Sequence, residues 1–283
     1  MRIYTEKKEV ISEIKRDLIE MWQTISTYSM QNKVIEWNED YDTKEITNYS
    51  FCLSDFDNIE ELMLYPEFEA AEKNRIREYF KTHKEKDYKD YIKKNIWKDI
   101  DNIEESWYEL LCMWLKLDLG ERLVWWINPG EAWKIRPWVW EEYLDKRNQF
   151  DYTYSERINL NGSWLMEEMI KHPTSRQYVF NIWDRWDRNW VNGQKRIPCS
   201  LNYQVLIRPT WERDKIWVNL IYNMRSCDFL THFPIDIIQA VWFLKHVTER
   251  LREELWEQYV IWKLYYNCAS LHLYKKDLKE DVF

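Results

Sequence analysis

Two apolar segments in the C-terminal half of the chain, 200–208 (SLNYQVLIR) and 215–224 (KIWVNLIYNM), are separated only by the polar stretch PTWERD. Both are rich in β-branched and aromatic residues, so each predicts a strand, and the short connection predicts a hairpin. A third segment, 177–183 (QYVFNIW), has the same character. Strands that lie side by side need a second layer to bury their apolar face, and this requirement constrains the architecture.

Segments with helical periodicity can supply that second layer. Residues 234–258 begin with Pro in the first turn and carry a long apolar face, which is typical of a buried or half-buried helix. Gly120 stands at a C-cap position, and Pro173 ends another apolar segment of helical period. The expected elements are helices over 7–27, 67–80, 106–120, 163–173 and 234–258, with one further strand over 47–55.

The order of these elements predicts the fold class. Helices and strands are mixed without a regular βαβ alternation, which favours an α+β fold with a mixed β-sheet and packed helices. Residues 56–105 are dense in charge and are expected to form a helical insertion or cover. No repeat, low-complexity segment or Gly/Pro-rich linker divides the chain, so residues 1–283 are expected to form one domain.

Composition argues against several classes of function. The chain has 41 basic and 49 acidic residues, a net charge of −8, which argues against coating a nucleic acid. Its five cysteines form no CxxC pair, and neither a disulfide framework nor a metal site is expected. No uncharged apolar run approaches the ~18 residues of a membrane span, and the first residues lack the apolar core of a signal peptide. We therefore expect a cytoplasmic protein.

Four short segments in the C-terminal half share an unusual composition. Taken in order, they resemble the signatures of the thymidylate synthase and deoxycytidylate hydroxymethylase superfamily. Those signatures are a Pro-Cys, an Arg-Ser-x-Asp followed by a Pro-x-Asn or Pro-x-Asp, and a His-Leu-Tyr. The four segments are HPTSRQ (172–177), RIPCS (196–200), NMRSCDFLTHFPIDI (223–237) and SLHLYKKD (270–277).

Three upstream segments extend the resemblance. It then covers residues 106–283, with a weaker similarity at 43–51, and leaves 1–105 as a divergent N-terminal part. A single motif of this kind would be weak, whereas this many in the same order are specific. The upstream segments are YELL (108–111), WEEY (140–143) and YSER (154–157).

The resemblance implies one-carbon transfer to C5 of a pyrimidine deoxynucleoside monophosphate, with 5,10-methylenetetrahydrofolate as cofactor. C5 of a pyrimidine is a poor nucleophile, and addition of a thiolate at C6 makes it reactive. Cys199 is similar to that thiolate, and Glu109 to the carboxylate that organises the proton-shuttling water. By the same resemblance, Tyr154 and Asp228 are further catalytic residues, and the cofactor ligands are Trp140, Tyr143 and Asp228.

The substrate ligands are also implied by the resemblance. Arg225 and Ser226 match a phosphate-binding pair, since a guanidinium suits a terminal phosphate. Arg176 matches an arginine that reaches the phosphate site of the partner subunit, so a homodimer is expected. His272 and Tyr274 match ligands of the sugar hydroxyl. The remaining substrate ligands implied are Gln204 and Asp236.

Asp236 bears on which base is recognised. Thymidylate synthases have asparagine at this position, which can pair with N3–H and O4 of uracil. A carboxylate repels O4 and accepts from the N4 amino group of cytosine. Family members with this aspartate form 5-hydroxymethyl-dCMP, a product typical of bacteriophages. We therefore expect dCMP hydroxymethylation, in the host cytoplasm if the protein is phage-encoded.

Two alternative functions stay open. A thymidylate synthase that methylates dUMP is disfavoured by Asp236 and by Ser200, where synthases have histidine. A catalytically impaired member, which binds a nucleotide or acts as a structural partner, is favoured by two departures from the family pattern. Gln177 replaces an arginine of the phosphate site, and His232 replaces a glycine that lies against the folate.

Some of these residues also have simple structural interpretations. Without the resemblance, Cys199 would be read as an inert buried thiol, and Cys227 is expected to be structural in any case. Asp236, near the start of a helix, would be stabilised by the helix dipole. Glu109 lies in an apolar helical segment, where a carboxylate needs a partner.

Overall fold

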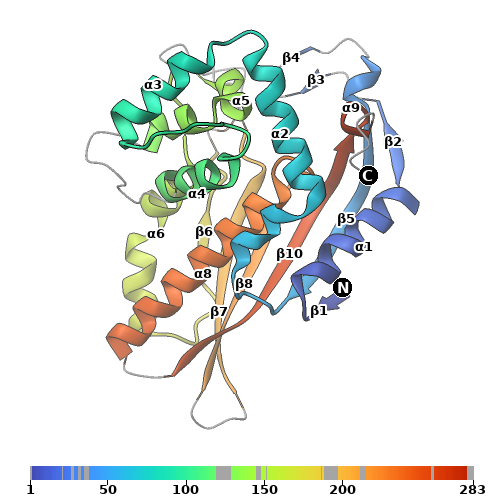
Figure 1. Cartoon of the computed structure of the whole chain (residues 1–283). Helices are drawn as coiled ribbons and strands as arrows, with labels where there is room; N and C mark the ends of the chain where they lie inside the picture. Colours follow the sequence, from blue (N-terminus) through green and yellow to red (C-terminus); the bar gives the residue numbers. More distant parts are fainter. Residues whose placement is uncertain are drawn as a thin grey trace.

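An eight-stranded mixed sheet organises the chain in this computed structural model (Figure 1). Its order is β1-β5-β10-β8-β7-β6, with β2 paired to β5 and β9 to β10. The structure describes residues 2–20, 22–26, 29–30, 33–34, 38–118, 129–144, 148–150, 152–185, 187, 197–210, 215–255 and 258–278. The strands of this sheet are β1 (Arg2–Tyr4), β2 (Gln23–Ile25), β5 (Thr43–Leu53), β6 (Val179–Asn181), β7 (Ser200–Pro209), β8 (Ile216–Met224), β9 (Cys227–Asp228) and β10 (Tyr259–Tyr274).

The pairing directions confirm the expected mixed sheet. β10 lies in the middle, antiparallel to β5 and parallel to β8. β7 and β8 pair in antiparallel fashion, as the two apolar segments predict, although 211–214 of the expected turn lie outside the described residues. β3 (Ser29–Met30) and β4 (Lys33–Val34) form a separate small ladder.

Helices form the second layer. Figure 1 shows α8 running along the sheet beside β8 and β10, with α1 beside β5, and these neighbours are in contact. The α-helices are α1 (Lys7–Glu20), α2 (Pro66–Phe80), α3 (Glu85–Ile96), α4 (Trp107–Asp118), α5 (Pro137–Trp140), α6 (Tyr154–Lys171), α8 (Phe233–Leu255) and α9 (Lys275–Leu278). The 3-10 helices are η1 (Glu39–Tyr41), η2 (Ile59–Leu64), η3 (Pro129–Ile135) and η4 (Glu141–Tyr143).

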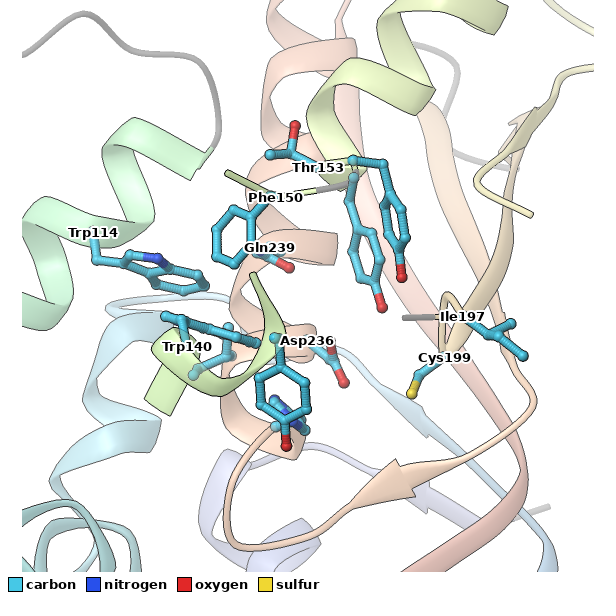
Figure 2. Close-up of a pocket in the computed structure, with 13 residues that line it drawn as sticks. Trp114, Trp140, Phe150, Thr153, Ile197, Cys199, Asp236 and Gln239 are labelled. Carbon is cyan, nitrogen blue, oxygen red and sulfur yellow. The ribbon is translucent and has the colours of Figure 1, made fainter. Parts of the chain in front are cut away.

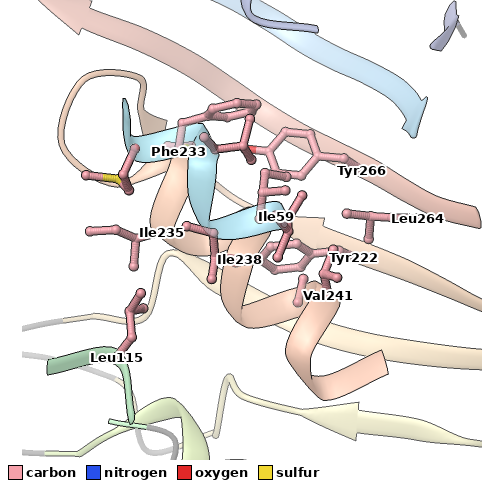
Figure 3. Packing of buried hydrophobic residues seen from close by; sticks show 14 of the residues in the cluster. Ile59, Leu115, Tyr222, Phe233, Ile235, Ile238, Val241, Leu264 and Tyr266 are labelled. Carbon is pink, nitrogen blue, oxygen red and sulfur yellow. The ribbon is translucent and has the colours of Figure 1, made fainter. Parts of the chain in front are cut away.

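The core lies between α8 and the sheet (Figure 3). Every second residue of a strand points to the same face, so Tyr222 of β8 and Tyr266 of β10 both face the helix layer. Their ring centroids are 5.6 Å apart, and Phe233 of α8 lies 5.6 Å from Tyr266. This packing fixes the N-terminal end of α8 against the middle of the sheet.

Two helices differ from the sequence expectation. The helix expected over 7–27 ends at Glu20, because Gln23–Ile25 pairs with β5 as strand β2. The helix expected over 163–173 begins already at Tyr154. A capping box starts it: the Thr153 side chain accepts from the backbone of Glu156, whose carboxylate accepts from the backbone N–H of Thr153.

The other expected helices are confirmed within a few residues as α2, α4 and α8, and Gly120 lies outside the described residues. The strand β10, which lies in the middle of the sheet, was not among the expected strands. Within the part of the chain that the structure describes, no helix is both long enough and apolar enough to cross a membrane.

A buried ion pair connects the helical cover to the rest of the fold. Arg136, before α5, donates two hydrogen bonds of 2.9 Å to the carboxylate of Glu72 in α2. Both side chains are 1% exposed. The indole of Trp138 donates to the same carboxylate at 2.8 Å, and Arg75 links it to Thr231, before α8, by a hydrogen bond of 2.7 Å. Residues 56–105 are therefore a packed cover, largely helical, as expected.

Candidate active site

An aromatic pocket lies beside the N-terminal end of α8 and the start of β7. Figure 2 shows the thiol of Cys199 and the carboxylate of Asp236 directed toward one another in this pocket. The described lining residues are Trp114, Trp140, Tyr143, Phe150, Tyr152, Thr153, Tyr154, Ile197, Cys199, His232, Ile235, Asp236 and Gln239.

The nucleophile candidate, Cys199, directly precedes β7 and is half-buried. Its sulfur accepts from the hydroxyl of Ser226 at 3.6 Å and from the guanidinium of Arg225 at 3.7 Å. A cationic donor and a hydroxyl donor therefore both lie at the sulfur. The structure brings Cys199, Arg225 and Ser226 together.

Arg225 also holds the turn that carries the thiol. Its Nε donates to the carbonyl oxygen of Pro198 at 2.9 Å, and its Nη2 donates to that of Ile197 at 3.0 Å. Its Nη1 donates to Ser226 at 3.0 Å. A guanidinium has five N–H donors, so these bonds leave little of the fork for a phosphate. In this structure, most of the hydrogen bonds of Arg225 stabilise the turn that carries Cys199.

Asp236 and a residue not expected from the sequence share one face of α8. Asp236 is 6% exposed, and Gln239, also 6% exposed, follows it by three positions, so both reach the pocket from adjacent turns. This spacing was the available signal for Gln239. Together they give the pocket a carboxylate and an amide, which suit the polar edge of a base.

Tyr154 lies on the pocket wall, near both Cys199 and Asp236. Its hydroxyl accepts from the backbone N–H of Ser200 at 3.4 Å. Burial, followed by the nearby Cys199 and Asp236, raises the pKa of Tyr154 well above its ordinary value, so the phenol stays protonated at neutral pH. The Ser200 side chain faces the core instead, where it bonds to the hydroxyl of Tyr222.

Stacked rings form another wall. Trp140 stacks with Trp114, with centroids 5.3 Å apart, and with His232 at 5.4 Å, and Tyr143 meets it edge-on at 6.2 Å. Trp140 and Tyr143 were expected here, whereas Trp114 was not. The sequence feature that could have indicated Trp114 is its spacing of four residues from Leu110, which puts both on the apolar face of α4.

A second group of expected residues lies beside the pocket. Asp228 accepts from the backbone N–H groups of Leu230 and Thr231 at 3.1 and 3.3 Å, and pairs in register with His272 across β9 and β10. Tyr274 lies edge-on to His272 at 5.3 Å. These three expected residues do not belong to the described lining of the pocket.

Electrostatics keep Asp228 ionised. Burial by itself would raise the pKa of the Asp228 carboxyl, but the nearby His232, His272 and Arg75 outweigh it and hold that pKa below its ordinary value. Tyr274 has its pKa raised, mainly by burial and then by Asp228 and Cys199, so its hydroxyl is protonated. Asp228, Tyr274 and Cys199 are therefore close enough to influence one another.

The expected catalytic residue Glu109 is not in the pocket, which corrects the sequence expectation of its place. Its side chain is 51% exposed and forms an ion pair with Lys98. The reason is how α4 packs: Leu110, Leu111 and Trp114 form its buried face, and Glu109 points away from it. The partner that its carboxylate needs is a surface lysine.

Arg176 and Gln204 are also away from the pocket of their own subunit. Arg176 is exposed, and its carbonyl oxygen accepts from the side chain of Gln204 at 3.1 Å. Gln204 stands four residues along β7 from Ser200, a path of roughly 13 Å at the usual strand rise. In the described part of the chain, no three His, Cys, Asp or Glu side chains gather in an arrangement that could hold a metal ion.

Comparison with known proteins supports the fold. No protein-family model matches the chain, and no curated protein matches it by sequence. Thymidylate synthase A from Bacillus subtilis is similar in structure, with 11% identity, a TM-score of 0.53, and coverage of 97% of this chain and 82% of that one. Thymidylate synthase from T4 phage aligns at 12% identity with a TM-score of 0.50, over 95% and 77% of the two chains. The α+β fold is thus that of thymidylate synthases.

Proposed function

We propose that this protein transfers a one-carbon unit to C5 of a pyrimidine deoxynucleoside monophosphate, and that its reaction is the hydroxymethylation of dCMP. One observation carries the proposal: a half-buried thiol, contacted by Arg225, shares an aromatic pocket with the buried carboxylate of Asp236. The similarity in fold to thymidylate synthases agrees with this reaction class.

The roles of the pocket residues follow from their placement. The thiolate of Cys199 adds to C6 of the base, and Arg225 and Ser226 stabilise its charge. Asp236 accepts a hydrogen bond from the N4 amino group, which uracil lacks. Tyr154, protonated at neutral pH, offers a hydroxyl near Cys199 and Asp236. A buried carboxylate left without this donor would disfavour uracil by about 1–3 kcal/mol.

The second ligand that we propose for this pocket is a folate. Tyr143, Phe150 and Tyr152 bring aromatic surface to the lining, whereas Trp140 is already stacked with Trp114 and His232. Flat heteroaromatic rings pack well on such surfaces. When bound, 5,10-methylenetetrahydrofolate would supply the one-carbon unit. Tyr143 and Trp140 would hold it, with Asp228 at the edge of the site.

The active unit that we propose is a homodimer. Arg176 is exposed and lies away from Cys199 of its own subunit, so it can serve only the phosphate site of a second copy. The sheet face opposite the helices carries half-buried residues such as Trp217, Ile221 and Tyr265, which a second copy would cover. His272 and Tyr274 would then bind the sugar of the same nucleotide.

A mixed-dimer experiment tests this arrangement. Arg176→Ala and Cys199→Ala are each expected to be inactive as homodimers. When the two are coexpressed, a mixed dimer contains one site with both wild-type residues if Arg176 acts across the interface, so activity should return. Activity that fails to return, or a sedimenting monomer with full activity, would contradict the shared site.

The function itself is tested by tritium release from [5-³H]dCMP and [5-³H]dUMP with methylenetetrahydrofolate. Release from dCMP is expected for the wild type, none for Cys199→Ala, and a shift toward dUMP for Asp236→Asn. Cys112→Ala, a half-buried thiol outside the pocket lining, and Asp99→Asn, an exposed carboxylate, are the matched controls. Release only from dUMP would instead support a thymidylate synthase.

A second candidate function has two observations in its favour. Glu109 is exposed, and most donors of Arg225 bind the Cys199 turn. A protein of this fold that binds a nucleotide without turnover would tolerate both features. It predicts nucleotide binding by calorimetry without tritium release from either substrate, and slow alkylation of Cys199 at neutral pH in the absence of nucleotide.

A further inference from the structure

The short segment 225–228 makes two separate contacts with the site. Its first two residues contact the sulfur of Cys199. Cys227 instead donates its thiol hydrogen to Oδ2 of Asp236, with the sulfur and oxygen 3.5 Å apart. Asp236 belongs to the described lining of the pocket, and Cys227 does not. Cys227 therefore contacts the carboxylate from behind the pocket wall.

The Cys227 thiol is a permanent donor. Its side chain is 1% exposed. Burial, with the negative charge of Asp236 added, raises the pKa of Cys227 well above its ordinary value, so the S–H is retained across the neutral range. The backbone oxygen of Asp228 is a second acceptor at 3.7 Å. The charged carboxylate is both closer and the stronger acceptor of the two.

Both partners of this hydrogen bond are held by backbone structure. Cys227 lies in β9 and pairs in register with Leu271 of β10. Asp236 lies in the first turn of α8, where its N–H donates to the carbonyl oxygen of His232 at 2.8 Å. A carboxylate can rotate about its last bond, and a donor fixed on a strand restricts that rotation.

We propose that Cys227 is a positioning residue for Asp236, whose carboxylate its thiol holds in the orientation that accepts a hydrogen bond from the amino group of a cytosine nucleotide. This inference rests on the proposed function and assigns a role to a cysteine that the sequence indicated to be structural. A carboxylate with one oxygen held by a donor keeps its orientation, so the other oxygen faces the base as a fixed acceptor, which suits the amino group of cytosine and not the O4 of uracil.

Equilibrium binding of dCMP and dUMP, without folate, tests the role. Cys227→Ala should reduce the preference for dCMP over dUMP about tenfold, and Cys227→Ser, which restores a donor, should recover it. Cys268→Ala is the matched control: this cysteine is also 1% exposed, but its thiol donates to the backbone of Ser270. It should lower stability and leave the preference unchanged.

Infrared spectroscopy of the S–H stretch reports the contact without any ligand. The band that Cys227→Ala removes should shift to higher frequency in Asp236→Asn, because a neutral amide accepts more weakly than a carboxylate. Should Cys227→Ala fail to fold, Cys227→Val removes the donor and fills the volume.

The two proposals fail in different ways. Unchanged preference in both Cys227→Ala and Cys227→Val, with dCMP still bound, overturns the positioning role alone. Absence of binding of either nucleotide to the wild type overturns the proposed function, and the positioning role for a base with it. An S–H band that does not respond to Asp236→Asn overturns the contact itself.

Discussion

The guanidinium of Arg225 lies 3.7 Å from the sulfur of Cys199, although 26 residues separate the two in the chain. The same side chain donates to the carbonyl oxygens of Ile197 and Pro198. One arginine thus both shapes the turn and supplies the positive charge beside the thiol. The reactivity of Cys199 is therefore expected to depend on Arg225, which directly follows strand β8.

Removal of this charge should slow alkylation of Cys199. A unit charge near 4 Å contributes about 1 kcal/mol even in bulk water, so Arg225→Met should lower the labelling rate by iodoacetamide at pH 7 roughly fivefold or more. Mass spectrometry of the Cys199 peptide measures the rate. Arg208→Met is the control, because Arg208 donates only to the carbonyl oxygens of Thr174 and Ile207 in the described structure. Equal slowing by both variants would contradict the prediction.

The buried pair of Arg136 and Glu72 should be costly to break on one side only. Arg136→Met leaves a buried carboxylate without its main partner and is expected to lower the free energy of unfolding by about 3–5 kcal/mol. The double variant with Glu72→Met should recover much of this loss, since it removes both charges.

Urea unfolding measures these free energies. An exposed pair, Lys81 with Glu78, serves as the control, and Lys81→Met should cost less than about 1 kcal/mol. A double variant that is less stable than Arg136→Met would contradict the interpretation of Glu72 as a stranded charge.

Protonation of Asp228 should account for part of the loss in the free energy of unfolding at acid pH. Its pKa in the folded state lies below the ordinary value of 3.8, so its ionised form stabilises the fold. That contribution is present above pH 3.8 and is lost as the pH falls through the folded-state pKa. Asp228→Asn should therefore be less stable than the wild type near pH 6, and the difference should shrink below pH 3.8. A difference that is constant with pH in urea unfolding would exclude this linkage.

Gly162→Ala should destabilise the protein, although alanine is the better helix former by about 1 kcal/mol. A Cβ at Gly162 would lie 2.6 Å from the ring of Phe180, closer than carbon atoms approach. Overpacking of this kind costs about 1–3 kcal/mol. Thermal unfolding measures the loss, and Phe180→Leu should rescue Gly162→Ala while being destabilising alone. A stabilised Gly162→Ala would show that the ring moves without cost.

Local sequence patterns predicted the elements whose formation depends mainly on their own residues. The β7 and β8 strands follow from two β-branched, aromatic-rich segments, and α8 follows from a Pro at its start and a long apolar face. The middle strand β10 was harder to predict, because both of its faces carry aromatic and apolar residues and no alternation marks it. The start of α6 was missed although Thr153 and Glu156 form a capping box.

The sequence by itself determined the α+β class, because its strand and helix segments are mixed without a regular βαβ alternation. That Cys199, Arg225 and Ser226 belong to one site was implied only by the resemblance of their motifs to a known family. Only the tertiary structure decided that α4 turns Trp114 toward the pocket and Glu109 toward solvent. The helix α4 is apolar around much of its circumference, so the sequence pattern does not determine which of its faces packs against the rest of the protein. The same holds for the bond from Cys227 to Asp236: a contact between a strand and a helix depends on how β9 and α8 pack, which no local pattern encodes.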